Sequence, residues 1–439
     1  MDTTEIIRGR TAKHLSSRPN PARTFPAVVS LILVLACAAS PFAAGQIPSL
    51  ERDALVSLFN STNGIGWTNN TNWCSSTCPG SGSVVFNAPG TECTWFGVTC
   101  TNKNEQSVEH VIFVQLASNH LSGTLPSLLG LASLQWFIVS GNQLTGTLPN
   151  LTDLTNLQFF FADDNQLTGS IPVISGLSGL QIFNVSANQL SGSIPSLTNV
   201  PGLGQFDAHS NQLTGGLPAA TAALSRFDVS FNQLNGDLSL LSGWSTVPAF
   251  FNVAHNQLTG NIPSLEGAVY LQSFEIDHNN ISGEIPILTE ASNLRRFLAD
   301  HNQLTGNLPV LTGLTVLSDF VVDHNHLSGN IPALNELWNL SLFDVSFNHL
   351  TGGIPDVAGL PNLQNFYVNY NELSGAVPAA PGWMVLVGVK SASLCPNAFD
   401  TTSSVNDAGW NIVTGFVPWW ATPYANNACD DLFTSEFDS

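Results

Sequence analysis

The stretch LRRFLADHNQLTGNLP, from Leu294 to Pro309, decides the fold because its pattern recurs along most of the chain. Its asparagine, Asn302, belongs to a series of twelve, and nine of the eleven gaps between them are 23 residues. The other two gaps, of 21 and 24 residues, lie on either side of Asn232. A fixed period of this length predicts a solenoid in which each repeat forms one coil. The twelve are Asn119, Asn142, Asn165, Asn188, Asn211, Asn232, Asn256, Asn279, Asn302, Asn325, Asn348 and Asn371.

Each repeat predicts a short strand followed by a turn. Apolar residues two apart, such as Phe343 and Val345, indicate a strand with one buried face. We expect the Asn amide to hydrogen-bond backbone groups that no sheet reaches, so that the Asn side chains form a column. Gly follows every Asn by four residues, where a turn needs positive φ or close backbone approach. Pro comes three residues later and stops the strand, except in the sixth repeat, where Ser239 stands.

Phenylalanine occupies the first inward strand position in eleven repeats. We expect these rings to form one dry column, and each buried aromatic removes roughly 150–250 Å² from water. No repeat buries its own apolar face, so stability comes from the stacking of neighbours. The column consists of Phe137, Phe160, Phe183, Phe206, Phe227, Phe251, Phe274, Phe297, Phe320, Phe343 and Phe366, with Val114 in the first repeat.

The pattern L-x-x-[LF]-x-[LV]-x-x-N-x-L-[ST]-G-x-[IL]-P resembles the plant-type leucine-rich repeat, and the resemblance covers Val111 to Pro378. It implies a curved right-handed α/β solenoid with a parallel sheet on its concave side. Short second strands, 3-10 segments and turns are implied for the convex side. Within this family the chain is most similar to the polygalacturonase inhibitors and to the ectodomains of receptor-like proteins. We assign residues 107–380 to the repeats.

Residues 1–45 have the pattern of a secretory signal peptide. An uncharged apolar run from Ala27 to Ala39 follows several basic residues, and it is too short to span a membrane. We therefore expect an extracellular protein. An alternative is a cell-surface lipoprotein, because the residues before Cys37 form a weak lipobox. The basic residues are Arg8, Arg10, Lys13, Arg18 and Arg23.

Six cysteines remain after the leader, and an even number in a secreted chain predicts disulfides rather than a metal site. Cys93 to Cys100 reads C-x-W-x-G-V-x-C, which resembles the N-terminal cap of plant-type repeat proteins. The resemblance implies a Cys93–Cys100 disulfide and so leaves Cys74 for Cys78. Cys395 and Cys429, beyond the last repeat, are assigned to a long-range disulfide of the C-terminal cap.

The two ends of the chain are expected to cap the solenoid, because an uncovered end repeat exposes its apolar face. We assign residues 46–106 to an N-terminal cap and residues 381–439 to a C-terminal cap. Thr414 to Pro418 resembles a decayed thirteenth turn. The N-terminal cap is expected to begin with a helix whose apolar stripe is Leu50, Ala54, Leu55, Leu58 and Phe59.

Outward strand positions of the first repeats carry adjacent apolar residues, which predict an exposed patch of the kind that marks interaction sites. The alternative is that the cap loop of residues 79–90 folds over it. The residues are Phe113, Trp136, Ile138, Phe159, Phe161 and Ile182.

Further along, the same face becomes acidic. Asp277, Asp300 and Asp323 form one column, roughly 5 Å apart by strand spacing. A second column consists of His255, His278, His301 and His324. The complete acidic set is Asp207, Asp228, Glu275, Asp277, Asp300, Asp319, Asp323 and Asp344, with Arg226 and Arg296 among them.

Three interpretations of this acidic face are open. In the first, the Asp-His-Asn motif is a solvent-exposed consensus that spread when the repeats were duplicated. In the second, it forms a surface that binds a basic protein or peptide. The third interpretation is a divalent metal site, although a flat column lacks an enclosing cage.

The formal net charge of −20 argues against nucleic acid and anionic membranes as partners. We predict a secreted protein that binds a protein partner through its acidic and aromatic concave face, with inhibition of a basic extracellular enzyme as the specific hypothesis. The alternative is an adhesion or envelope protein that binds polysaccharide or matrix. No catalytic constellation, cofactor motif or transmembrane segment stands out from the repeats, so we do not expect an enzyme.

Overall fold

The computed structural model describes residues 46–75, 78, 84–101, 108–220, 224–244, 246–388, 391–400, 402 and 404–420. The expected signal peptide, with Cys37, lies outside these residues, and so does Cys429. Within the described part of the chain, no helix combines the length and the apolar character that crossing a membrane requires.

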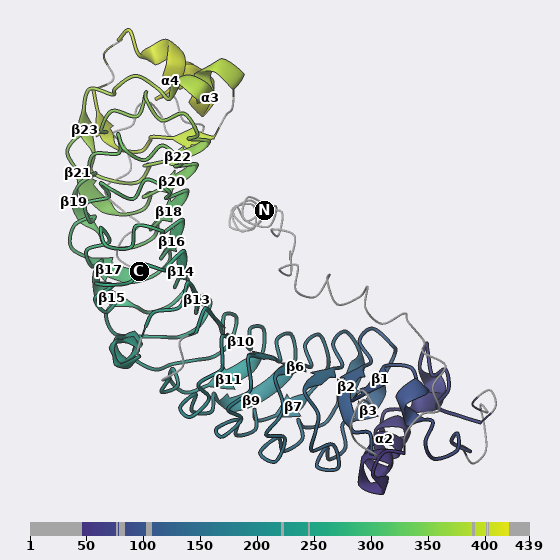
Figure 1. Ribbon diagram of the computed structural model, residues 1–439. Helices are drawn as coiled ribbons and strands as arrows, with labels where there is room; N and C mark the ends of the chain where they lie inside the picture. The colour runs from purple at the N-terminus through teal and green to yellow at the C-terminus, as the bar shows by residue number, and fades with distance from the viewer. Residues whose placement is uncertain are drawn as a thin grey trace, which may run out of the picture. The chain divides into compact units, whose positions relative to one another are not determined.

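One sheet of fourteen strands runs through the whole repeat array, and it lies on the inner side of the bend in Figure 1. All of its strand pairs are parallel except the first, in which β1 runs antiparallel to β2. The strands are β1 (Val98–Cys100), β2 (Val111–Gln115), β4 (Trp136–Ile138), β6 (Phe159–Phe161), β8 (Ile182–Asn184), β10 (Gln205–Asp207), β12 (Arg226–Asp228), β13 (Phe250–Asn252), β14 (Ser273–Glu275), β16 (Arg296–Leu298), β18 (Asp319–Val321), β20 (Leu342–Asp344), β22 (Asn365–Tyr367) and β24 (Ala392–Ser393).

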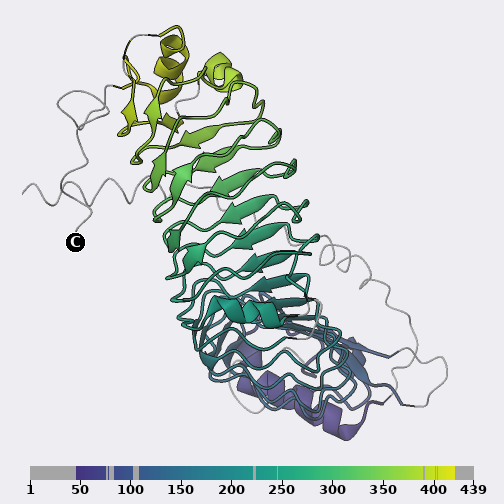
Figure 2. The same cartoon turned by 90° about the vertical axis from the view of Figure 1, so that its left-hand side faces the viewer.

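Shorter parallel sheets follow the Asn turns on the opposite side of the array (Figure 2). Most of these strands are formed by residues of the L-[ST]-G motif that follows each Asn. Together the two sets of strands confirm the predicted solenoid. The second set is β3 (Ser122–Thr124), β5 (Gln143–Thr145), β7 (Thr168–Gly169), β9 (Gln189–Ser193), β11 (Gln212–Thr214), β15 (Ser282–Glu284), β17 (Gln303–Thr305), β19 (Ser328–Asn330), β21 (His349–Thr351), β23 (Ser374–Gly375) and β25 (Ala398–Phe399).

The asparagine column forms as expected, and its hydrogen bonds join side chains to backbone. Asn302 Nδ2 donates to three carbonyl oxygens, one of the preceding coil and two of its own, at 3.0–3.3 Å. Its Oδ1 accepts from the Ile281 N–H of the preceding coil at 2.9 Å. Each amide thus ties two coils together. Asn397 adds a further position in the C-terminal tail, where it accepts from Leu373 N–H.

The phenylalanine column is dry from end to end, as predicted. All eleven rings have no exposed surface. Successive centroids are 5.3–5.9 Å apart and the planes are nearly parallel. Trp410 contacts Phe366 and closes the C-terminal end of the column.

In eleven of the twelve repeats the turn glycine has the predicted positive φ, between 72° and 99°. The exception is Gly236 in the sixth repeat, the one that also lacks the proline. There the 3-10 helix η3 (Leu238–Gly243) follows the turn, and Asp237 caps it by accepting from Ser239 N–H. The two irregular Asn spacings therefore mark a different turn rather than a break in the array.

The N-terminal end carries α2 (Ser49–Ser61) and the 3-10 helices η1 (Gly64–Gly66) and η2 (Glu92–Thr94). The predicted disulfides Cys74–Cys78 and Cys93–Cys100 are both present. Four of the five residues predicted for the apolar stripe of α2 are buried, but Leu50 is 70 % exposed. Leu50 is the second residue of the helix, and its side chain does not join the core.

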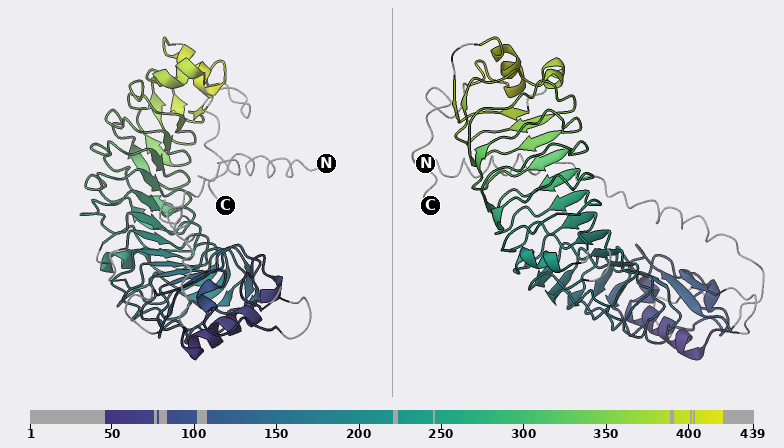
Figure 3. Two further views of the ribbon diagram at one scale, coloured as in Figure 1. Left: turned by 45° about the vertical axis from the view of Figure 1, so that its right-hand side comes forward. Right: turned by 60° about the vertical axis from the view of Figure 1, so that its left-hand side comes forward.

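The C-terminal end carries α3 (Gly382–Val387) and α4 (Asp407–Thr414), at the yellow end of the chain in Figure 3. The thirteenth coil is formed by β24, Asn397 and β25. The prediction of a thirteenth turn at Thr414 to Pro418 is therefore wrong, because Thr414 ends α4 and Gly415 caps that helix with φ 78°. Cys395 is disulfide-bonded.

Candidate functional site

The outward side chains of the fourteen-stranded sheet form the candidate site. In each coil the residues before and after the buried Phe point outward. So does the residue two positions before the Asn of the asparagine column, which we call the ladder Asn. In the coil of β16 these positions hold Arg296, Leu298 and, just after the strand, Asp300. Because every strand pair keeps the Phe residues in register, equivalent outward side chains form columns across the repeats.

The aromatic end of this face is brought together by β2, β4 and β6. Trp136 stacks on Phe159 with centroids 3.7 Å apart, and Phe113 lies 5.7 Å from Trp136. The expectation of a fully exposed patch is wrong in part, because Phe159 and Phe161 are only 8 % and 9 % exposed. The rings cover one another, and Phe113, Trp136, Ile138 and Ile182 remain half-buried.

The alternative prediction was that the cap loop of residues 79–90 folds over this patch. Residues 79–83 of that loop lie outside the described residues. In the described part, Phe86 packs against Phe59 and Trp95 inside the cap. Ser75 N–H and Asn87 N–H fix this part of the loop by backbone hydrogen bonds.

The middle of the face contains ion pairs within the protein, which the sequence pattern did not predict. Arg226 contacts Asp228 at 2.6 Å and Asp207 at 3.5 Å. Arg296 contacts Glu275 at 2.7 Å and Asp319 at 3.4 Å. Half of the predicted acidic set, four of eight carboxylates, is therefore in contact with an arginine. The signal was present in the sequence, since both arginines occupy the outward position before a buried Phe.

Burial changes the proton affinity of several of these carboxyl groups. Burial, together with the charge of Asp228, raises the pKa of Asp207 to about 6. Burial and the charge of Asp323 raise the pKa of Asp344 to about 7. The pKa of Glu275 is also raised by burial, against the opposing effect of Arg296.

The Asp and His columns lie beside each other over four coils, as the sequence predicted. The Asp300 Oδ2 atom is 3.6 Å from His278 Nδ1 and 3.1 Å from His301 Nδ1. The imidazoles are 33–42 % exposed, whereas the three carboxylates are 13–16 % exposed. A molecule that approaches this part of the sheet therefore meets imidazole edges first and carboxylates between them.

The histidines belong to a longer stack of rings that was not recognised from the sequence. Every described residue immediately before a ladder Asn has positive φ, and the four histidines have φ of 51–53°. Their rings stack at 4.1–4.2 Å. Phe231 continues the stack at one end, and Phe347 and Tyr370 continue it at the other. Alignment of the repeats on their Asn would have revealed it.

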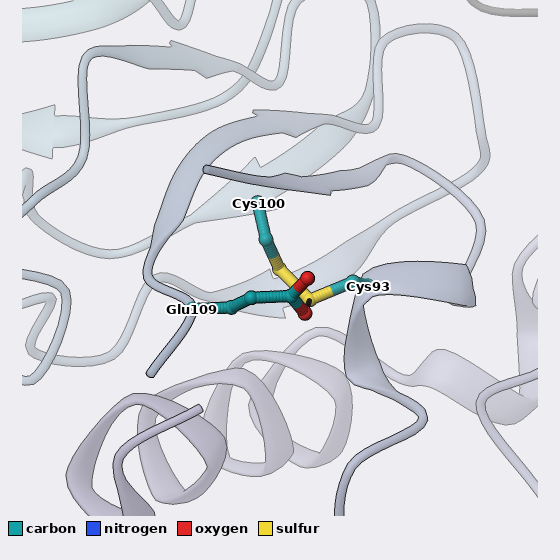
Figure 4. A group of neighbouring side chains, drawn as sticks. All are labelled: Cys93, Cys100 and Glu109. Carbon is teal, nitrogen blue, oxygen red and sulfur yellow. Dashed lines mark hydrogen bonds between the residues drawn. A yellow bond between two sulfur atoms is a disulfide. The ribbon is translucent and has the colours of Figure 1, made fainter. Parts of the chain in front are cut away.

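A second group of metal-ligand residue types lies in the N-terminal cap and is not a metal site. Figure 4 shows the Glu109 carboxylate against the Cys93–Cys100 disulfide, with Oε2 3.2 Å from Cys93 Sγ. Metal binding by cysteine requires the thiolate, and both sulfurs are committed to the disulfide.

The repeat, its Asn and Phe columns and the two sets of parallel strands define the class: the chain has the fold of a plant-type leucine-rich-repeat protein. Among solved structures it is similar to the plant peptide hormone receptor RGFR1 in complex with RGF2, with 27 % identity and a TM-score of 0.55. That alignment covers 66 % of this chain and 55 % of the receptor chain, so this chain matches little more than half of the receptor's length.

Two further structures are more distant. A TDR receptor is 23 % identical, with a TM-score of 0.48, over 68 % of this chain and 66 % of that chain. A plant ice-binding protein is 19 % identical, with a TM-score of 0.43, over 82 % of this chain and 100 % of that chain. No family model matches the chain, and no curated protein matches its sequence.

Proposed function

We propose that this protein is secreted and binds a cationic peptide or a basic protein along the outward face of its fourteen-stranded sheet. The observation that carries the proposal is the Asp column, Asp277, Asp300 and Asp323, which follows the ends of β14, β16 and β18. The two arginines of the face pair with other carboxylates, so Asp277 and Asp300 have no arginine or lysine partner among the described residues. A cationic ligand supplies the missing charge.

The surroundings of the column support this proposal. The outward positions of β14 to β20 carry mainly charged or hydroxyl side chains, and the formal net charge of the chain is −20. A field of this sign attracts basic molecules and raises their association rate. The similar structure is that of the plant peptide hormone receptor RGFR1 in complex with RGF2. We infer that this chain also binds a protein or peptide ligand.

The more specific form of the proposal is that the partner is a basic secreted enzyme, which the bound solenoid inhibits. The aromatic end of the same sheet, centred on Trp136, then provides a second, apolar contact, which β8, β10, β12 and β13 separate from the coils of the acidic column. Aromatic residues are enriched among those that dominate binding energy, and charged neighbours steer the encounter.

Capture from the native extracellular medium tests the proposal. The wild-type chain is expected to retain basic proteins or peptides, and retention should weaken as salt screens the charges. The triple variant Asp277→Arg, Asp300→Arg, Asp323→Arg should lose this binding. Equal retention by the variant, or a captured set without basic members, would refute the proposal.

A control variant with the same change in net charge separates local from global electrostatics. Glu290, Glu336 and Asp356 are exposed and lie outside the sheets. Their reversal to Arg should leave most of the binding intact. Circular dichroism of both triple variants checks that the array still folds, and the triple Asn variant of the column repeats the test without added bulk.

The aromatic end favours a second candidate, an adhesion or envelope protein that binds polysaccharide or matrix. Phe113, Trp136 and Phe159 form a continuous row of rings on the sheet. In this case Trp136→Ala should abolish capture, the acidic triple variant should not, and the captured material should be polysaccharide.

A further inference from the structure

The Asp and His columns contain three groups with the residue types and spacing of a metal site. The groups are His255, Asp277 and His278; His278, Asp300 and His301; and His301, Asp323 and His324. In each group one nitrogen or oxygen per residue lies within 4.8 Å of the other two. We propose that these groups bind divalent transition-metal ions, with two imidazoles and one carboxylate to each ion.

The distances between carboxylate and imidazole are close to those that such an ion requires. Bonds of about 2.0–2.1 Å in tetrahedral geometry place ligand atoms roughly 3.4 Å apart. Asp277 Oδ2 is 3.3 Å from His278 Nδ1 and 3.7 Å from His255 Nε2. In the last group Asp323 Oδ2 is 2.8 Å from His324 Nδ1 and 4.0 Å from His301 Nδ1. Rotation of the imidazoles out of their stack brings each set to ligand spacing.

The backbone holds the ligands in place. The four histidines share the same left-handed conformation, because the next residue of each coil is a ladder Asn fixed by its hydrogen bonds. Their rings stack with planes 14–28° apart, whereas an imidazole binds an ion through a lone pair in its own plane. The two rings of a group therefore tilt apart when they bind the same ion, while the backbone keeps both side chains next to the carboxylate.

The donor set selects the kind of ion. Imidazole with carboxylate suits zinc, copper and nickel, whereas calcium takes six to eight oxygen ligands. Each group offers three protein ligands on the exposed edge of the imidazoles, which leaves positions for water. The flat column therefore suits an open site and needs no enclosing cage.

The groups overlap, and the overlap fixes the stoichiometry. His278 belongs to the first and second groups, and His301 belongs to the second and third. The first and third groups share no residue. Since the middle group competes with both, the column holds two ions at saturation.

Calorimetric titration of the untagged full-length chain with Zn²⁺ tests this count, with Ca²⁺ as the contrasting probe. The wild type should bind two Zn²⁺ ions and no Ca²⁺ at these groups. His278→Asn, His301→Asn double substitution should remove both, because it leaves no complete group. Zn²⁺ binding that is absent in the wild type, or unchanged in the double variant, overturns the proposal.

Two matched Asp substitutions distinguish the sites from a diffuse acidic surface. Asp300→Asn removes only the middle group and should leave two ions. Asp277→Asn leaves the second and third groups, which share His301, and should leave one. Equal losses from the two variants would show general charge attraction and overturn the assigned groups. The titration needs no protein partner, so its result is independent of the proposed function.

Discussion

Replacement of one ladder asparagine should destabilise the array far more than its surface area suggests. Asn302→Ala deletes an amide that accepts from Ile281 N–H at 2.9 Å and donates to the carbonyls of Ile276, Ala299 and Asp300. These backbone groups lie where water does not reach, since Asn302 itself is buried. Each buried group left without a partner costs about 1–3 kcal/mol.

The expected loss follows from that count. Ile281 N–H loses its acceptor outright. The carbonyls of Ile276, Ala299 and Asp300 each keep another donor, namely Asn279 Nδ2, Asn325 Nδ2 and His278 N–H. One unpaired donor and the lost amide hydrogen bonds together lower the expected free energy of unfolding of Asn302→Ala by about 2–4 kcal/mol. Gln303→Ala, on the adjacent exposed side chain, is the matched control and should cost less than about 0.5 kcal/mol.

A second substitution separates the two halves of the amide. Asn302→Asp keeps an acceptor for Ile281 N–H but turns a carboxylate oxygen toward three carbonyl oxygens. At pH 7 it should therefore be more destabilising than Asn302→Ala. The folded state raises the pKa of the introduced carboxyl, so part of the loss should be recovered as the pH falls through that pKa and the group becomes a donor.

Urea unfolding at pH 7 and pH 4.5 measures these differences. Repeat arrays do not always unfold in one step, so hydrogen exchange of β15, β17 and β19 should be followed as well. Faster exchange should be centred on the coils of Asn279, Asn302 and Asn325. Two results would refute the asparagine column as a main source of stability. One is a loss of unfolding free energy below about 1 kcal/mol for Asn302→Ala, and the other is a smaller loss for Asn302→Asp than for Asn302→Ala at pH 7.

Two other predictions concern the phenylalanine column and the buried acid Asp207. Phe297 stacks between Phe274 and Phe320, with centroid distances of 5.8 and 5.6 Å. In urea unfolding, Phe297→Ala should therefore lower the free energy of unfolding by about 3–5 kcal/mol, and Phe297→Leu should lower it clearly less. Equal losses from the two variants would contradict the role of stacking. The pKa of Asp207 is raised from 3.8 to about 6, so this carboxyl lowers wild-type stability as the pH rises from 4 through 6. Relative to wild type, Asp207→Asn should therefore gain up to about 3 kcal/mol between pH 4 and pH 7, and a pH-independent difference would contradict the raised pKa.

The repeat sequence was sufficient to predict the architecture, because each coil uses the same few residues for the same structural roles. Asn302 shows why: its position four residues before Gly306 and five after Phe297 already implies a turn, a positive φ and a buried strand face. The sixth repeat shows the limit of the pattern. The missing Pro at Ser239 marked an irregular coil, but the 3-10 helix from Leu238 depends on how Asp237 caps it.

The candidate site was predicted less completely. The Asp and His columns could be aligned from the sequence, because equal spacing places equivalent side chains one above another. The sequence places Arg226 and Arg296 at outward positions before a buried Phe. Which four carboxylates they contact was not predicted, because these contacts depend on rotamers and on residues between 2 and 23 positions away. The burial of Phe159 and Phe161 was not predicted either, because it depends on how their rings pack against neighbouring side chains.

The sequence by itself determined the coil, because a 23-residue period, an Asn that serves two coils and a Phe that no single coil can bury admit few other arrangements. The tertiary structure decided the character of the inner face. Outward side chains are not held by the repeat's own hydrogen bonds, so their charge, exposure and mutual contacts depend on which residues the stacking places beside them. That is why Asp300 lies between two imidazoles while Asp228 is paired with an arginine, although both occupy outward positions of the same sheet.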